Sequence, residues 1–334
     1  MHIKSKLPAT LAICCSSLVL SASYAEKVRL PAIINGAEKT SSFAPLEAKP
    51  LATTTANARS KSKKKKGYKL VWHDEFNGNK LDTAAWNIED NGNGNGNQEL
   101  QYYSARGVSF GREPETGAKC LILTARREKH GAHSFTSGRI NTQGKVKVCH
   151  GIVEARIKFP KTANGLWPAF WLLGDNYRDC GWPRCGEIDI LEMGNQDGIK
   201  QNSQATLFNG ACHWGYYNDK GQYPNHYQAH DNAYSLQDGK FHTFTLCWDE
   251  KKLKMFVDRD INKDAKPYFT MDIADKTNDL AAGNYFHHDF FIIFNLAVGG
   301  LFTSITAPGD ISALSYKEEA KMYVDWVRVY KKNK

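Results

Sequence analysis

The sequence predicts one large all-β domain over residues 68–334, and we expect it to fold as a sandwich of two sheets. Short runs of β-branched and aromatic residues recur through this region, separated by Gly, Asn, Asp and Pro clusters. No amphipathic run is long enough to form a helix that could organise a core. One run, Phe290–Leu296, is apolar nearly throughout, which is typical of a strand covered on both faces.

Individual strands are expected where this pattern is densest. Residues 152–159 alternate polar and apolar side chains, which predicts a half-buried strand. Five further runs have the composition of strands: Leu121–Ala125, Thr243–Trp248, Lys252–Asp258, Phe290–Leu296 and Tyr323–Tyr330. No linker-like break and no internal repeat interrupts this region, so we expect a single domain.

The first 25 residues have the pattern of a secretory signal. His2, Lys4 and Lys6 precede the apolar run Leu7–Val19, and Ser23-Tyr24-Ala25 offers a small-x-small cleavage site. The apolar run is too short to span a bilayer comfortably, and no later segment is apolar for long enough to do so. We therefore expect a secreted or periplasmic protein without a membrane span. A buried N-terminal helix or a membrane anchor is the alternative.

The net charge of +9 is concentrated at the N-terminus. Residues 1–67 hold 12 Lys and Arg against 3 Asp and Glu, which leaves 32 of each sign in residues 68–334. A neutral domain lacks the positive field that nucleic-acid binding needs, so we expect no nucleic-acid partner. The Lys-rich, polar segment 26–67 is predicted to be a disordered tether because like charges repel and stay solvated. Attraction to an anionic cell surface is the alternative role.

Cysteine usage fits an exported protein. Two of the eight cysteines lie in the signal, and the other six are Cys120, Cys149, Cys180, Cys185, Cys212 and Cys247. An even number after export predicts disulfides, although the pairing stays open. Cys180–Cys185 is the local pair we expect, because it would close a loop that contains Gly and Pro. A zinc site is the alternative, but the chain has neither a second such pair nor an HExxH motif.

The residues with catalytic chemistry lie in Gly186-Glu187-Ile188-Asp189-Ile190-Leu191-Glu192-Met193. Glu187 and Asp189 share a face of a regular strand, whereas Glu192 would point to the opposite face. One extra residue, a β-bulge at Ile190-Leu191, would return Glu192 to the face of the other two. Clustered carboxyl groups raise the pKa of the least solvated member, which produces one ionised nucleophile and one protonated acid. Glycoside hydrolysis uses such a pair, with a narrow gap for retention and a wider gap for inversion.

Alternating acids on a strand are more often a solvated sheet face, so the neighbouring residues decide the interpretation. Trp167 and Trp171 lie on the preceding run, four residues apart and thus on one strand face, and Trp182 lies on the joining loop. Indole rings stack on the C–H faces of sugar rings and offer an N–H to a hydroxyl group. The combination predicts a carbohydrate-binding surface beside the acids.

Taken together, these segments resemble glycoside hydrolase family 16. The similar segments are the acid strand, Gly165-Leu166-Trp167-Pro168-Ala169-Phe170-Trp171-Leu172-Leu173-Gly174, Trp72-His73-Asp74-Glu75-Phe76-Asn77-Gly78, Gly96-Asn97-Gln98-Glu99-Leu100-Gln101-Tyr102-Tyr103, Ser137-Gly138-Arg139-Ile140, Asn295-Leu296-Ala297-Val298-Gly299-Gly300 and Tyr323-Val324-Asp325-Trp326-Val327-Arg328-Val329-Tyr330. They occur in order across nearly all of residues 68–334. The ExDxxE spacing resembles the laminarinase, agarase and carrageenase branches, and the Trp-rich and GNxELQYY segments look most like endo-1,3-β-glucanases.

The resemblance implies a β-jelly-roll sandwich of two curved antiparallel sheets with an open substrate cleft on the concave face, and a retaining mechanism. It implies that Glu187 is the nucleophile, that Glu192 is the general acid/base, and that Asp189 supports the nucleophile. The residues expected to bind the polysaccharide are Trp167, Trp171, Trp182, Asn97, Arg139 and His213. A structural role for His213 at a sheet edge is the alternative. We expect a monomer that needs no cofactor for catalysis.

Other implications of the resemblance stay open. Some members bind a structural calcium ion, and Glu75 and Asp325 are the matching positions, although a strand acid capped by backbone or Arg is the alternative. Many laminarinases continue with Trp-Pro-Gly after the double glycine, whereas this chain has Leu301-Phe302-Thr303. The Tyr-, His- and Asn-rich stretch 208–234 is also unusual, and we expect it to form an insertion beside the cleft. The alternative functions are hydrolysis of mixed-linkage glucan, agarose or carrageenan, or glucan binding without catalysis.

Overall fold

The structure is a computed structural model that describes residues 65–333. The expected signal, residues 1–25, and residues 26–64 of the expected tether lie outside the described residues. Within the described part, the Nζ atom of Lys65 lies 2.9 Å from Glu154 Oε1, and the Tyr68 amide donates to the Lys65 carbonyl. Lys65 therefore contacts the ten-stranded sheet although it lies three residues before the predicted domain boundary, because a buried carboxylate is its partner.

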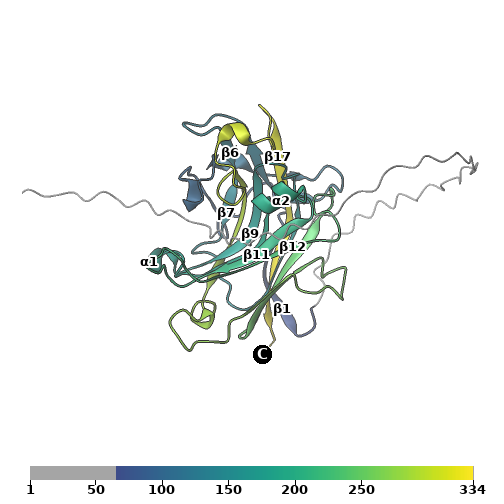
Figure 1. The fold of residues 1–334 in the computed structure, drawn as a ribbon. Helices are drawn as coiled ribbons and strands as arrows, with labels where there is room; N and C mark the ends of the chain where they lie inside the picture. Colours follow the sequence, from purple (N-terminus) through teal and green to yellow (C-terminus); the bar gives the residue numbers. More distant parts are fainter. Residues whose placement is uncertain (1–64, 334) are drawn as a thin grey trace, which may run out of the picture. The chain divides into compact units, whose positions relative to one another are not determined.

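Two sheets form the domain (Figure 1), as the strand-rich sequence predicted. The first sheet has ten strands: β15 (Phe269–Asp272), β14 (Lys252–Val257), β13 (His242–Trp248), β8 (Gly151–Lys158), β17 (Glu319–Lys332), β5 (Lys119–Arg126), β6 (Phe135–Ser137) and β3 (Gln101–Tyr103) in order, with β1 (Tyr68–Asp74) paired to β17 and β4 (Val108–Arg112) paired to β5. Its pairs are antiparallel except the short pair β3–β6.

The second sheet carries the predicted acid strand as an inner strand, beside the Trp-rich strand. Its order is β12 (Asn225–Asp231), β11 (Leu207–His213), β10 (Glu187–Met193), β9 (Leu166–Gly174), β16 (Phe290–Val298), β7 (Arg139–Asn141) and β2 (Asn87–Ile88). Figure 1 shows β11 beside β12 in this sheet, whereas β6 and β17 belong to the other sheet. The described α-helices are short: α1 (Tyr177–Cys180) and α2 (Gln196–Gln201). No described helix has the length and apolar character to cross a membrane.

The core fills the space between the sheets with aromatic and aliphatic side chains. Along β9 the even-numbered residues enter this core, and Phe170 stacks on Phe294 with ring centroids 4.7 Å apart. Trp167 and Trp171 are odd-numbered and lie on the opposite face, away from the core. This alternation places the indole rings on the same face as the acids.

Strand β8 is more deeply buried than its alternating sequence predicted, because it lies inside the ten-stranded sheet rather than at a solvated face. Its polar side chains are held by partners of opposite charge. Glu154 pairs with Lys65, Arg156 with Asp325 and Lys158 with Glu113. A buried charge is tolerated only with such a partner. The prediction of a half-buried strand was therefore wrong in burial, although its position was right.

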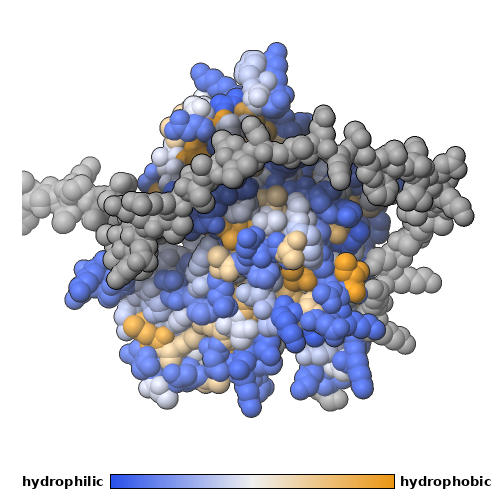
Figure 2. Space-filling model, turned by 45° about the vertical axis from the view of Figure 1, so that its right-hand side comes forward, coloured by the Kyte–Doolittle hydropathy of each residue, from blue (hydrophilic) through white to orange (hydrophobic). Residues whose placement is uncertain are grey.

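Figure 2 shows one face of the molecule, where hydrophobic residues form small groups among hydrophilic ones. Two of the most exposed large hydrophobic residues are Ile261 and Tyr316. Isolated exposed side chains of this kind are normal on a folded protein.

Candidate active site

The predicted β-bulge is present in β10. The pairing of β10 with β11 shifts between Asp189 and Glu192, and the pairing with β9 shifts between Asp189 and Leu191. Ile190 and Leu191 are both fully buried in the core. The extra residue therefore returns Glu192 to the face that carries Glu187 and Asp189.

Glu192 is held by two hydrogen-bond donors from the neighbouring strands. The Trp167 indole Nε1 donates to Glu192 Oε1 at 3.1 Å, and Asn209 Nδ2 donates to Glu192 Oε2 at 2.7 Å. Trp167 lies on β9, and Asn209 lies directly opposite Glu192 on β11. Both contacts fix the carboxyl group on the open face of the sheet.

Glu187 and Asp189 share a different partner. His213 lies opposite Glu187 on β11, and its Nε2 is 3.3 Å from Asp189 Oδ2 and 3.9 Å from Glu187 Oε1. Apart from this imidazole, Asp189 Oδ2 is buried without a hydrogen-bond partner. The Tyr223 hydroxyl lies 3.2 Å from His213 Nδ1 and so orients the ring. His213 thus lies within the acid cluster.

Burial sets the protonation of the three acids. It raises the pKa of Glu187 and of Glu192 to about 8, and the negative charge of Asp189 adds to the rise. Burial also raises the pKa of Asp189 well above its usual range. Positive charge opposes these effects, since His213 lowers the pKa of both glutamates and Arg139 lowers that of Glu187. The cluster therefore retains protons at neutral pH, and Arg139 is the cation that favours ionised Glu187.

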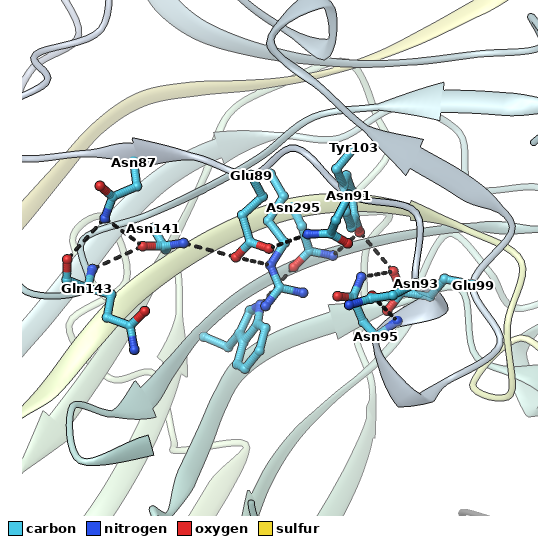
Figure 3. Close-up of polar contacts among 12 residues, drawn as sticks. Asn87, Glu89, Asn91, Asn93, Asn95, Glu99, Tyr103, Asn141, Gln143 and Asn295 are labelled. Carbon is cyan, nitrogen blue, oxygen red and sulfur yellow. Dashed lines mark hydrogen bonds and ion pairs between the residues drawn. The ribbon is translucent and has the colours of Figure 1, made fainter. Parts of the chain in front are cut away.

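A polar network extends from the acids toward β7 and β2. Arg139 Nε lies 3.0 Å from Glu89 Oε1, and its guanidinium lies over the rings of Trp171 and Tyr103. Trp171 Nε1 donates to Asn295 Oδ1 at 2.7 Å, and the Asn295 amide reaches the Tyr103 hydroxyl. Figure 3 shows Glu89 between Asn141 and Asn91, and Tyr103 beside Glu99. This network presents many fixed donors and acceptors, as recognition of sugar hydroxyl groups requires.

The predicted tryptophans take three different positions. One ring face of Trp167 is covered by Phe302, whose ring lies parallel to it with centroids 4.6 Å apart. Trp171 carries Arg139 over its ring. Trp182 contacts His213, Tyr217 and Tyr223 at the end of the sheet. Phe302 thus occupies the segment where the sequence departs from Trp-Pro-Gly, and it supports the tryptophan that binds Glu192.

Asn97 lies apart from the acid strand but beside this segment, because its carbonyl accepts a hydrogen bond from the Leu301 amide. The stretch 208–234 forms β11, β12 and a hairpin between them, rather than an inserted loop throughout. Hydrogen bonds between Asn218 and Gln222 close that hairpin, and the Trp214 indole donates to the Leu280 carbonyl at its base. The hairpin brings Tyr217 and Tyr223 into contact with Trp182, and Tyr223 also contacts His213.

The segment 175–186 covers one end of the same sheet face. Cys180, Trp182 and Cys185 pack there against Leu173, Phe291 and Ile293, as a small second hydrophobic cluster. The six described cysteines all have free thiols, so the structure does not contain the predicted disulfides. Their even number did not imply pairing because Cys120, Cys212 and Cys247 belong to different strands, whose partners in register are not cysteines. Cys180 and Cys185 share one cluster, yet both remain thiols.

The residues predicted for calcium have arginine partners. Glu75 forms two hydrogen bonds with Arg328, at 2.8 Å each, and Asp325 Oδ2 accepts from Arg156 at 2.6 Å. Calcium needs six to eight oxygen ligands, whereas these carboxylates already face guanidinium groups. The described residues therefore fit ion pairs at Glu75 and Asp325 better than a calcium site.

One described group has ligand atoms close enough together for a metal ion, namely Glu187, Asp189 and His213, within 4.8 Å of one another. Its members belong to the acid cluster described above. A cavity of about 550 Å³ lies beside this end of the sheet and is lined by residues that include Arg184, Tyr216 and Tyr285, but not by the three acids. The acids instead lie on the sheet face.

Comparison with known proteins decides the family. The family model described as "Beta-porphyranase A-D, GH16 domain" matches residues 71–332. The chain belongs to glycoside hydrolase family 16. A GH16 protein of the mixed-linkage glucan locus of Bacteroides ovatus, solved with a product, is 41% identical, with a TM-score of 0.68, and the match covers 77% of this chain and 99% of that one. The laminarinase catalytic domain of Thermotoga petrophila is 30% identical, with a TM-score of 0.62, over 80% and 99% of the two chains.

Curated relatives of this GH16 chain include a β-glucanase from Rhodothermus marinus, 30% identical over 81% of this chain and 88% of that protein. Two others are longer. The chain spans about a third of the clotting factor G alpha subunit of Tachypleus tridentatus (34%) and of the glucan endo-1,3-β-glucosidase A1 of Niallia circulans (38%). The fold and the family are thereby confirmed, including the two-sheet architecture that the sequence predicted.

Sequence reasoning missed several residues of the site: Glu89, Tyr103, Asn209, Tyr223 and Asn295. Asn209 had a usable signal, since it is a polar residue inside the otherwise apolar run Leu207–Cys212. Such a residue needs a buried partner. Tyr223 had no comparable signal, because its contact with His213 depends on the hairpin geometry.

Proposed function

We propose that this family 16 protein is an endo-acting β-glucanase that hydrolyses β-1,3-glucan with retention of configuration. The observation that carries the proposal is the bulged strand β10, which gathers Glu187, Asp189 and Glu192 on one sheet face beside three tryptophans. Retaining glycosidases use two such carboxyl groups on either side of the scissile bond.

In the first step, ionised Glu187 attacks the anomeric carbon while protonated Glu192 gives its proton to the leaving oxygen. This forms a glycosyl ester on Glu187 and releases the shortened chain. In the second step, Glu192 takes a proton from water, the resulting hydroxide attacks the anomeric carbon, and Glu187 leaves as a carboxylate. Asp189 and His213 lie beside Glu187, and His213 and Arg139 favour its ionised form, which exists before the attack and again after the ester is hydrolysed.

Mixed-linkage β-glucan is the second candidate substrate. It is favoured by the higher identity to the Bacteroides ovatus protein, 41%, than to the Thermotoga petrophila laminarinase, 30%. Agarose and carrageenan remain alternatives from the sequence pattern. The equal numbers of acidic and basic residues in 68–334 favour an uncharged glucan over a sulfated polymer.

The test is a panel of polymers with reducing-sugar detection: laminarin, mixed-linkage β-glucan, agarose and carrageenan. We expect hydrolysis of laminarin, with the β-anomer appearing first in proton NMR. Glu187→Ala should be folded and lower turnover by at least about a thousandfold, with azide restoring some activity and giving an inverted product. Activity confined to mixed-linkage glucan would select the second candidate. Full activity of both Glu187→Ala and Glu192→Ala would exclude the proposed mechanism.

We also propose that the enzyme acts outside the cytoplasm, as a monomer and without a cofactor. The N-terminal signal pattern supports export, and the carboxyl groups supply the proton transfer and the nucleophile that the reaction needs. N-terminal sequencing of the exported protein, sedimentation, and activity after chelation test the three parts. We expect cleavage after Ala25, a monomeric mass, and unchanged activity in chelator.

A further inference from the structure

Asn209 is the polar side chain closest to the acid Glu192, and the hydrogen-bonding capacity of its amide is only partly used. The residue is fully buried on β11, directly opposite Glu192. Its Nδ2 contacts Glu192 Oε2 at 2.7 Å, whereas its Oδ1 is buried with no hydrogen-bond partner. A buried amide with one unsatisfied end is unusual and needs an explanation.

The other oxygen of Glu192 restricts where a proton can sit. Oε1 accepts a hydrogen bond from the Trp167 indole, and an indole N–H can only donate. A proton on Oε1 would compete with this donor, so the acid form of Glu192 is expected to carry its proton on Oε2. That proton then faces the Asn209 amide.

The amide can serve both protonation states of Glu192. An amide nitrogen donates to an ionised carboxylate, whereas a carboxylic O–H needs the amide oxygen as its acceptor. Half a turn about the last side-chain bond of Asn209 exchanges Nδ2 and Oδ1. Asn209 Oδ1 has no hydrogen-bond partner in the present orientation. The contact with Glu192 therefore decides whether Nδ2 or Oδ1 of Asn209 faces the carboxyl group.

We propose that Asn209 is a positioning residue for the acid/base, accepting the Glu192 Oε2–H through Oδ1 in the acid form and donating Nδ2–H to the carboxylate in the base form. The inference rests on the proposed role of Glu192. Burial raises the pKa of Glu192 to about 8, so the acid form exists at neutral pH. Each turnover uses both forms, and Asn209 therefore turns between the two chemical steps.

The kinetic test compares two substrates in the full chain. Asn209→Leu should lower kcat/KM on laminarin at least about tenfold, because the leaving alcohol needs the proton. On a dinitrophenyl glycoside of a β-glucan oligosaccharide, whose leaving group needs little protonation, kcat/KM should fall less than about threefold. Asn209→Asp keeps a hydrogen-bond acceptor beside Glu192 Oε2 and so stabilises the protonated form of Glu192. The alkaline limb of the pH–activity profile of this variant should therefore move to higher pH.

The matched control is Asn232→Leu, which also replaces a largely buried asparagine, near the edge of the same sheet. It should change kcat/KM on the two substrates by the same factor. An equal loss on both substrates in Asn209→Leu would show a merely structural role and would overturn the inference. Wild-type activity in Asn209→Leu on laminarin would overturn it as well.

A second measurement does not depend on activity. Neutron diffraction of the wild-type protein, well below and well above the Glu192 pKa of about 8, locates the proton and the amide. We expect Asn209 Oδ1 toward protonated Glu192 in the first case and Nδ2 toward the carboxylate in the second. Nδ2 facing Glu192 in both would overturn the inference. If the wild-type protein hydrolysed no β-glucan, the proposed function would fail, while this measurement would still decide the behaviour of Asn209.

Discussion

Glu187 and Glu192 are the same residue type on one strand, and their neighbours give them different chemistry. Glu187 has a cation, Arg139, among the groups that lower its pKa, together with His213. The groups that lower the pKa of Glu192 are His213 and the neutral donors Asn209 and Trp167. Positive charge favours the ionised form that a nucleophile needs, whereas neutral amide and indole groups are compatible with a carboxyl group that gains and loses a proton.

At the residue scale, this difference predicts the effect of Arg139→Gln. Removing the cation raises the pKa of Glu187 further, so the acidic limb of activity, where the nucleophile ionises, should move to higher pH by up to about one unit. The pH dependence of inactivation by a 2-deoxy-2-fluoro glycoside measures this limb, because the label bonds to the nucleophile. Arg184→Gln is the control, since Arg184 is exposed and contacts the Tyr216 ring. An unchanged limb in Arg139→Gln would contradict the assignment.

The sequence predicted the acids and several neighbours at this scale, but not the partners that set their protonation. Glu187, Asp189 and Glu192 lie in one short segment, so their spacing could be read from the sequence and predicted that they share one strand face. Asn209 and Tyr223 reach the site from β11 and the following hairpin. Their roles depend on strand register and on loop geometry between distant segments, and the amino-acid sequence alone does not specify either.

At the scale of elements, the bulge in β10 is the feature on which the site depends. Ile190 and Leu191 both enter the core, and only this extra residue keeps Glu187 and Glu192 on one face. A strand without the extra residue would put one glutamate into the core or slip its register.

Deleting Leu191 should therefore abolish catalysis by more than about a hundredfold in whatever protein folds, and lower stability by about 2–5 kcal/mol through the lost buried side chain. Leu191→Val is the control, since it reduces the core volume but keeps the bulge and should retain most activity. Hydrolysis of laminarin and chemical denaturation measure the two effects. Normal turnover by the deletion variant would show that the acids do not need this bulge.

The strands themselves were largely predictable, because their β-branched and aromatic runs are local patterns. The runs predicted at 243–248 and 290–296 are contained in β13 and β16. The cover formed by segment 175–186 was not predictable, nor was the free state of Cys180 and Cys185. Both depend on the second hydrophobic cluster, which joins residues more than a hundred positions apart.

At the scale of the whole molecule, one ion pair joins Lys65 of the Lys-rich segment to the ten-stranded sheet. Glu154 is buried in the ten-stranded sheet, where Lys65 and the Thr245 hydroxyl are its partners. Without Lys65 this carboxylate would lose the ammonium group that lies 2.9 Å from it, and the Thr245 hydroxyl and Arg328, which lies opposite on β17, would remain. Breaking one partner of a buried pair destabilises a protein because it leaves an uncompensated charge.

We therefore expect Lys65→Met to lower the free energy of unfolding by about 1–3 kcal/mol. Lys66→Met is the control, since the neighbouring lysine is exposed and should change stability little. Urea denaturation of the two variants measures the difference. Equal stability of both variants and the wild type would mean that the Lys65–Glu154 ion pair contributes nothing to the stability of the fold.

The carboxyl groups of Glu187 and Glu192 also affect the stability of the whole molecule, but they lower it. Burial raises the pKa of Glu187 and Glu192 from 4.5 to about 8. Between these values the folded state binds more protons than the unfolded state, so its stability falls as pH rises through this window. The ionised carboxyl groups of Glu187 and Glu192 thus oppose folding above this window, as is common for the strained groups of functional sites.

Replacing either glutamate with glutamine removes the titrating group but keeps the shape. Glu187→Gln and Glu192→Gln should be more stable than the wild type at pH values near and above about 8, on the order of 1–3 kcal/mol, and nearly equal to it below about pH 4. Glu319→Gln is the control, because the pKa of Glu319 is lowered instead of raised. Its pKa is lowered by the Lys321 hydrogen bond and by Arg126, so its removal should not stabilise at high pH. Thermal unfolding from about pH 4 to about pH 9 measures the three differences, and a gain that did not grow with pH would contradict the raised pKa values.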